Sequence, residues 1–338
     1  MTEGKFYKKL GHENLQCQLC QHYCFIKDKK EGICRARINR GGKLYSLVYG
    51  FPVAQNVDPV EKKPLFHYYP GSYTYSFGTL GCNLHCANCQ NWQISQAKQV
   101  EEYGKKSAFI SPERIVNEAL SNGCRSIAYT YNEPTIFTEY ALDIMKLARE
   151  NELKNVWVSN GYMSRACLSA IIPYLDAINV DLKSMSEDFY KDYCGARLKP
   201  ILENLKILND SLVHLEITSL IIPGLTDDPV MLNQLAAFIA VELDLNIPWH
   251  ISKFSPDISW KLKKAAATSD ELVYTAWEIG REAGLNFVYA GNLPGDEREN
   301  TYCPSCGELA IRRFGYEIER FDNHGRCDKC DKDLEIFS

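Results

Sequence analysis

The feature that most constrains the fold is a regular alternation of strand-like and helix-like segments across residues 72–290. Short runs of β-branched and aromatic residues alternate with segments whose apolar residues recur at helical spacing, as from Phe137 to Leu147. Alternating strands and helices form parallel sheets, because each helix returns the chain to the same edge. Strands are expected at 73–79, 126–131, 155–159, 177–181, 214–222, 250–254 and 286–289, and helices at 112–123, 135–151, 164–172, 186–193, 200–209, 227–241 and 269–283. Six or seven such units predict an α/β fold with a partial or full barrel, whose chemistry lies at the carboxyl ends of the strands.

The chain divides into three zones. Residues 1–71 hold four cysteines, residues 72–290 form the expected barrel, and residues 291–338 begin with a polar Gly/Pro segment and hold four more cysteines. Hydrophobic residues make up 45% and charged residues 24%, which excludes a disordered or collagen-like chain. The net charge of −5 gives no overall attraction to nucleic acid. No apolar run reaches the roughly 18 residues of a membrane span, and no signal peptide is visible, so a cytoplasmic location is expected.

Eleven of the fourteen cysteines lie in three clusters. In a reducing compartment, clustered thiols indicate metal ligands rather than disulfides. The central cluster, Cys82, Cys86 and Cys89, follows the first expected barrel strand. Three thiolates on a four-iron cube leave one iron open to a substrate. A zinc site built from the three cysteines and His85 is the alternative. The crowding of all three cysteines into one loop favours the cluster.

The triplet, its position after the first strand and the βα repeats resemble the radical SAM superfamily. This resemblance implies a partial (β/α) TIM-like barrel, a [4Fe-4S] cluster and S-adenosylmethionine (SAM) bound to the open iron. It also implies an electron donor such as a flavodoxin or ferredoxin, and reductive cleavage of SAM to a 5′-deoxyadenosyl radical. That radical would abstract hydrogen from a protein, peptide or small molecule. The segments 159–161, 180–183 and 222–228 are similar to strand ends of the activating enzymes of pyruvate formate-lyase.

A narrower resemblance spans essentially the whole chain. The segments CQLCQHYC and GICRARIN, the CQN at Cys89, the segment YTYNEPT and the four-cysteine tail are similar to the radical SAM member of the AmmeMemoRadiSam system. The other proteins of that system are then implied as partners. Two alternatives stay open. One is a glycyl-radical enzyme activase, against which the added cysteine zones argue, and the other is a non-catalytic multi-zinc interaction protein.

The resemblance implies SAM contacts after the second barrel strand. The activating enzymes hold the SAM amino group with a Gly-Gly-Glu segment, and the matching place here reads Tyr131-Asn132-Glu133. The carboxylate is kept as Glu133, and Asn132 is expected to offer a side-chain oxygen to the ammonium. Without glycine the backbone approaches a ligand less freely. Asn88 replaces an aromatic residue that often stacks near adenine, so Trp92 is a candidate for that contact, or is simply part of the core.

Further SAM contacts are expected at the following strand ends. Asp181 and Lys183 share one face of a strand and suit the ribose hydroxyls and the SAM carboxylate, or form a structural ion pair. Ser159 and Asn160 end the preceding strand, and Thr218 is expected to reach SAM or the substrate from the next one.

Two residues are candidates for chemistry on the substrate. Cys194 would donate a hydrogen atom to a substrate radical, and the alternative is an ordinary buried cysteine. His250 on a late strand would handle protons, and the alternative is a hydrogen-bonded core histidine.

The flanking cysteine sets predict two further metal sites. Two CxxC pairs, twenty residues apart in the C-terminal zone, have the spacing of a zinc ribbon: Cys303, Cys306, Cys327 and Cys330. They predict a rubredoxin-like zinc module that stabilises the protein or serves as a docking surface. Residues 303–338 carry six basic and eight acidic residues, so nucleic acid is not an expected partner. The N-terminal set predicts zinc or an auxiliary iron–sulfur cluster, with zinc favoured for so short a loop: Cys17, Cys20, Cys24 and Cys34. Four cysteines leave no open coordination position, so this site is not expected to cleave SAM.

Overall fold

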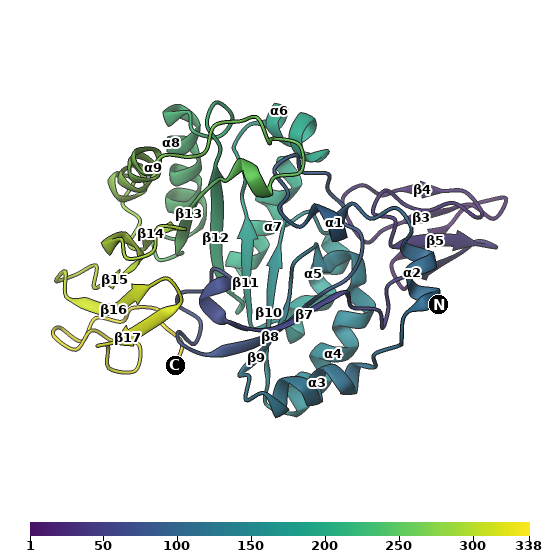
Figure 1. Ribbon diagram of the computed structural model, residues 1–338, viewed down its shortest axis with the longest axis horizontal. Coiled ribbons are helices and arrows are strands. Elements are labelled where there is room, and N and C mark those ends of the chain that lie inside the picture. Colours follow the sequence, from purple (N-terminus) through teal and green to yellow (C-terminus); the bar gives the residue numbers. More distant parts are fainter.

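The computed structural model describes residues 1–338 and is built around an open eight-stranded sheet (Figure 1). The strand order is β14-β13-β12-β11-β10-β9-β8-β7, with β8 to β14 parallel and β7 antiparallel at one edge. The strands are β7 Ala54–Pro59, β8 Tyr73–Gly78, β9 Ser126–Tyr129, β10 Lys154–Ser159, β11 Ala177–Asp181, β12 His214–Ile221, β13 Trp249–Lys253 and β14 Val288–Gly291. The seven parallel strands confirm the predicted α/β fold, and the unpaired edges β7 and β14 make it a partial barrel.

Helices follow the parallel strands, and most of them cover the outer face of the sheet (Figure 1). They are α1 Trp92–Ser95, α2 Val100–Lys106, α3 Pro112–Ser121, α4 Thr138–Glu150, α5 Arg165–Ile171, α6 Glu187–Phe189, α7 Lys199–Asn209, α8 Pro229–Ala237 and α9 Asp270–Glu282. Helix α3 begins as its Ser-Pro-Glu sequence predicts, because the Ser111 side chain accepts a hydrogen bond from the Arg114 N–H. Outward strand residues such as Ile127, Trp157 and Ile178 are fully buried in a single core with apolar helix residues.

Two expected helices continue as π-helical turns. Helix α6 runs into η4, Tyr190–Cys194, and α8 runs into η5, Phe238–Leu243. Single π turns are frequent at functional sites. The turn η4 ends at Gly195, which takes the left-handed conformation (φ +70°) that glycine adopts without strain. Remaining short 3-10 turns are η1 Val60–Lys62, η2 Pro134–Phe137, η3 Ile172–Tyr174, η6 Pro256–Ile258 and η7 Glu297–Glu299.

The amino ends of the strands are closed by the segment that joins β7 to β8. Val60, Leu65 and Tyr68 form a buried cluster with inward residues of β9 to β11, namely Ala128, Val156 and Ala177. The sheet therefore starts at β7, ahead of the zone boundary at residue 72 suggested by the sequence. These side chains fill the amino ends of the strands, so a ligand is expected at the carboxyl ends.

The cysteine-rich zones lie at opposite sides of the sheet (Figure 1). The N-terminal zone forms two small sheets, from β1 Thr2–Glu3, β6 Lys43–Ser46 and β5 Arg37–Arg40, and from β2 Tyr7–Lys9, β3 Leu15–Cys17 and β4 Phe25–Ile26. The C-terminal zone forms one, from β15 Thr301–Tyr302, β16 Leu309–Phe314 and β17 Glu317–Arg320. No helix combines the length and the apolarity needed to cross a lipid bilayer.

Candidate active site

The three clustered cysteines lie in the loop between β8 and α1, at the carboxyl end of the sheet. The Leu84 N–H donates to the Cys82 sulfur (3.4 Å), and the Cys89 sulfur lies 3.3 Å from the Ser95 hydroxyl. Burial raises the pKa of the Cys82 and Cys89 thiols. Metal binding would displace these protons, because thiolates are the metal-binding form.

Two asparagines from the neighbouring strand ends hold this loop. The Asn132 side-chain oxygen accepts from the Thr79 N–H (3.1 Å), and its amide donates to the Gly81 carbonyl (2.7 Å). The Asn160 amide donates to the Asn83 side-chain oxygen (2.9 Å). Asn132 was expected to offer its oxygen to the SAM ammonium, but here that oxygen binds the triplet loop.

Glu133 joins the carboxyl ends of β9 and β10. Its buried carboxylate accepts from the Thr135 N–H (3.1 Å) and hydroxyl (2.5 Å), the Ser159 hydroxyl (2.9 Å) and the Asn160 N–H (2.7 Å). Burial raises the pKa of Glu133, and these four donors oppose that effect. The structure thus brings Glu133, Ser159 and Asn160 together with Asn132, as a hydrogen-bonded frame around the triplet loop.

Tyr131 takes the backbone conformation that glycine would favour. Its φ of +67° is left-handed, and its hydroxyl donates to Asp58 Oδ2 (2.7 Å). The ends of β8 and β9 approach each other closely at Gly78 instead. A Cβ on Gly78 would lie 2.5 Å from the Thr130 carbonyl oxygen, so only glycine fits there. The sequence indicates Tyr131 only as the residue in the place of a family glycine, and its bond to Asp58 is seen only in the structure.

Lys183 and Asp181 form an ion pair beside the triplet. The Lys183 Nζ donates to Asp181 Oδ2 (2.7 Å), and the Lys183 side chain is only 13% exposed. Burial opposes the lysine charge, but the negative charges of Asp181 and of an ionised Cys86 outweigh it and hold the pKa of Lys183 above its ordinary value. Asp181 ends β11 and Lys183 lies two residues beyond the strand, so the two side chains pair with each other, and their contact with SAM stays a prediction.

Cys194 lies against the triplet. The segment that ends η4 pairs with the cysteine loop, because the His85 N–H donates to the Cys194 carbonyl (2.9 Å) and the Ala87 N–H to the Tyr193 carbonyl (2.8 Å). The buried Cys194 thiol lies close to Cys86, and the interaction between the two groups lowers the pKa of Cys86 and raises that of Cys194. A cysteine that is isolated in the sequence thus lies beside the triplet loop. Trp92, the adenine candidate, begins α1 directly after this loop.

His250 lies in the amino half of β13, away from the triplet. Its Nε2 lies 2.5 Å from Glu216 Oε2, and its ring packs against Phe66 and Tyr289. Burial raises the pKa of Glu216, but hydrogen bonds with His214 and His250 outweigh it and hold that pKa below its ordinary value. The structure places His250 in a hydrogen-bonded core cluster and does not bring it to the cysteines.

The residues near the triplet fit a [4Fe-4S] cluster and SAM. Not all of the three sulfurs lie within 4.8 Å of one another, whereas one zinc ion would hold tetrahedral sulfurs about 3.8 Å apart. A cube needs the wider spacing, since each cysteine binds a different iron. The Thr218 Oγ1 is buried without a partner on β12, opposite Asp181 of β11, and suits a polar ligand.

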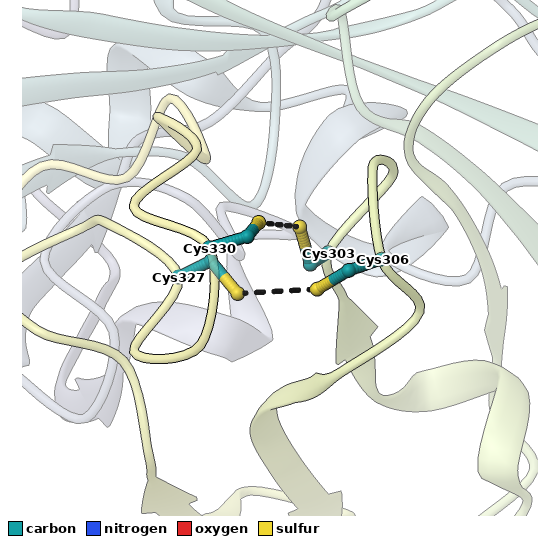
Figure 2. A group of neighbouring side chains, drawn as sticks. All are labelled: Cys303, Cys306, Cys327 and Cys330. Atoms are coloured by element: carbon teal, nitrogen blue, oxygen red, sulfur yellow. Dashed lines mark hydrogen bonds between the residues drawn. The ribbon is translucent and has the colours of Figure 1, made fainter.

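The C-terminal cysteines form a compact four-sulfur group, shown in Figure 2. All four sulfurs lie within 4.8 Å of one another. The Cys303 and Cys330 sulfurs are 3.5 Å apart, and those of Cys306 and Cys327 are 3.6 Å apart. This spacing fits a single tetrahedral metal ion.

Comparisons with known proteins agree with this geometry. Residues 77–235, which include the triplet, match the family model of the Radical SAM superfamily. The chain is 40% identical over 339 residues to the uncharacterized protein MJ0808 of Methanocaldococcus jannaschii, covering 99% of each. It is 26% identical to a pyruvate formate-lyase-activating enzyme of Clostridium pasteurianum over 60% of this chain and 87% of that one. It is also 26% identical to an isethionate sulfite-lyase activating enzyme of Desulfovibrio desulfuricans, over 49% and 56%. The chain therefore belongs to the radical SAM superfamily.

Proposed function

We propose that this protein is a radical SAM enzyme that removes a hydrogen atom from a protein, peptide or small-molecule substrate. The carrying observation is the thiol triplet, held in one loop over the open carboxyl end of the sheet by Asn132 and Asn160. Cys82, Cys86 and Cys89 would hold a [4Fe-4S] cluster. When bound and reduced there, that cluster supplies the electron that cleaves SAM to a 5′-deoxyadenosyl radical.

The chain's own residues would bind and orient SAM around this loop. Lys183 presents a positive charge that suits the SAM carboxylate, and Asp181 presents an acceptor for the ribose hydroxyls. Thr218 offers a hydroxyl that has no partner in the protein. Glu133, Ser159 and Asn160 position the loop rather than touch the ligand, because their hydrogen bonds are internal.

Three finer assignments belong to the same proposal. The protein would act as the radical SAM component of the AmmeMemoRadiSam system, and the motifs that span its length support this assignment. Its electron donor would be a flavodoxin or a ferredoxin. The C-terminal group would bind Zn²⁺, which its sulfur spacing and two CxxC pairs support. The free thiols suit a reducing compartment such as the cytoplasm.

The test is formation of 5′-deoxyadenosine. Anaerobically reconstituted protein with dithionite and SAM is expected to release 5′-deoxyadenosine, and Cys86→Ala is expected to abolish it. Cys124→Ala is the matched control, because Cys124 is also buried but lies at the amino end of β9, outside the three clusters. Full turnover by Cys86→Ala, or a loaded protein that never cleaves SAM, would show the proposal to be wrong.

A second candidate is activation of a glycyl-radical enzyme. Similarity to two proteins named as activating enzymes favours it. Incubating the reduced protein and SAM with a glycyl-radical enzyme of the same organism would then produce a glycyl radical detectable by electron paramagnetic resonance. If 5′-deoxyadenosine is formed but no radical appears on that partner, activation of a glycyl-radical enzyme is ruled out and only the first proposed function stands.

A further inference from the structure

The four N-terminal cysteines share one site. Cys17 ends β3, Cys24 precedes β4, and Cys17 and Cys20 are buried while Cys24 and Cys34 are half-buried. The Cys17 N–H donates to the Cys24 carbonyl (2.9 Å), and the Cys24 sulfur lies beside Gly32, two residues before Cys34. Burial raises the pKa of the Cys20 thiol, and the nearby Cys17, Cys34 and Cys24 raise it further. Four thiols that the sequence spreads over eighteen residues are therefore gathered around one space.

The spacing of these sulfurs differs from that of the C-terminal group. No three of the four N-terminal sulfurs lie within 4.8 Å of one another, whereas all four C-terminal sulfurs do. A single zinc ion, with Zn–S bonds of about 2.3 Å, needs sulfurs about 3.8 Å apart. A four-iron cube needs them farther apart, since each binds its own iron. In this respect the N-terminal set is like the triplet and unlike the C-terminal group.

The N-terminal set directly adjoins the triplet loop. The Cys34 carbonyl packs on Gly81, where a Cβ would lie 2.4 Å from its oxygen, and Gly81 immediately precedes Cys82. His22, which lies between Cys20 and Cys24 in the sequence, places its Nε2 2.7 Å from the Asn83 carbonyl oxygen. Cys34 of the N-terminal set is thus in van der Waals contact with Gly81, the residue next to Cys82 of the triplet.

We propose that Cys17, Cys20, Cys24 and Cys34 bind a second [4Fe-4S] cluster, which passes single electrons to the cluster at the triplet. The relay rests on the proposed function, whereas the cluster itself does not. A one-electron donor of the ferredoxin or flavodoxin class reduces the N-terminal cluster from the 2+ to the 1+ state. The cluster returns to 2+ when that electron moves to the triplet cluster, and no bond forms or breaks. Because every iron has a cysteine ligand, this cluster binds no SAM.

The cluster is tested in a full-length variant that lacks the triplet, Cys82→Ala/Cys86→Ala/Cys89→Ala, purified without oxygen. It is expected to keep about four iron and four sulfide per chain with about one zinc. Its reduced form would give an electron paramagnetic resonance signal that SAM does not change. About two zinc and no iron would overturn the proposal. This result is independent of SAM cleavage, so it is separable from failure of the proposed function.

The relay is tested with the triplet intact. Cys24→Ser/Cys34→Ser changes the two less buried ligands, and Cys124→Ser is its control. With reduced flavodoxin or ferredoxin, the double variant is expected to form 5′-deoxyadenosine at least about tenfold more slowly, while excess dithionite restores the rate to within about twofold. An unchanged rate with the protein donor, or loss with both reductants, would contradict the relay.

Discussion

Tyr131 shows how a single residue shapes the site. The left-handed backbone at this position costs a non-glycine residue about 1–3 kcal/mol, and the bond from its hydroxyl to Asp58 helps to hold it. Asn132 follows in the buried turn after β9, and both polar atoms of its side chain form hydrogen bonds, with Thr79 and with Gly81. Residues in the place of the family's ligand-binding segment thus position the triplet loop.

Asn132→Ala is expected to weaken cluster binding. It leaves the buried Thr79 N–H and Gly81 carbonyl without their partner, at about 1–3 kcal/mol each. Groups that orient metal ligands typically change metal affinity about 10–100-fold. Iron retained after treatment with a chelator measures this effect. Asn233→Ala, on an exposed position of α8, is the control and is expected to retain iron like the wild type. Equal retention by Asn132→Ala would mean that the loop holds its shape without this side chain.

At the scale of elements, the segment between β7 and β8 forms the base of the barrel. The N–H groups of Phe66 and His67 donate to the Glu216 carboxylate, and His67 Nε2 lies 2.6 Å from the Tyr289 hydroxyl. Burial lowers the pKa of His67 to about 3. His67 is therefore neutral in the folded protein at pH values where the unfolded chain binds a proton.

This segment predicts that stability falls with acid. The unfolded His67 titrates near pH 6.5 and the folded one near 3, so the unfolded state gains a proton as the pH falls below about 6.5. The free energy of unfolding is expected to decrease by about 1.4 kcal/mol per pH unit between pH 6 and 4 from this residue. The comparison is urea unfolding of wild type and His67→Phe across that range. The variant is expected to have the shallower pH slope, whereas identical slopes would contradict the assignment. His12→Gln, an exposed position, is the control.

At the scale of the whole molecule, the C-terminal module is attached to the base of the barrel. The buried Arg313 guanidinium donates to the Phe66 carbonyl (2.9 Å), to the Glu299 carbonyl (3.1 Å) and to the Thr301 hydroxyl (2.7 Å). The triplet lies at the other end of the strands. The metal in this module is thus expected to contribute stability rather than chemistry.

The Cys306→Ser variant distinguishes a contribution of this module to stability from a contribution to catalysis. Cys306 is exposed, so its replacement disturbs little packing while removing one of four ligands. The variant is expected to lose about one zinc per chain and to unfold at a lower temperature. Its iron content and its 5′-deoxyadenosine formation are expected to stay within about twofold of wild type. Ser305→Ala, the adjacent exposed position, is the control for zinc content. A large loss of turnover on zinc removal would show that the module acts at the active site.

The sequence alone determined the order of strands and helices, because hydrophobic periodicity is local and each βα unit repeats it. It also determined which cysteines group, since the CxxC and CxxxCxxC spacings bring ligands together within one turn or loop. The tertiary structure decided what lies between those groups. The Cys194 carbonyl contacts His85, Cys34 contacts Gly81 and His250 bonds to Glu216 only through packing between segments far apart in the chain. Such contacts depend on how the whole sheet curves, and no local pattern encodes them.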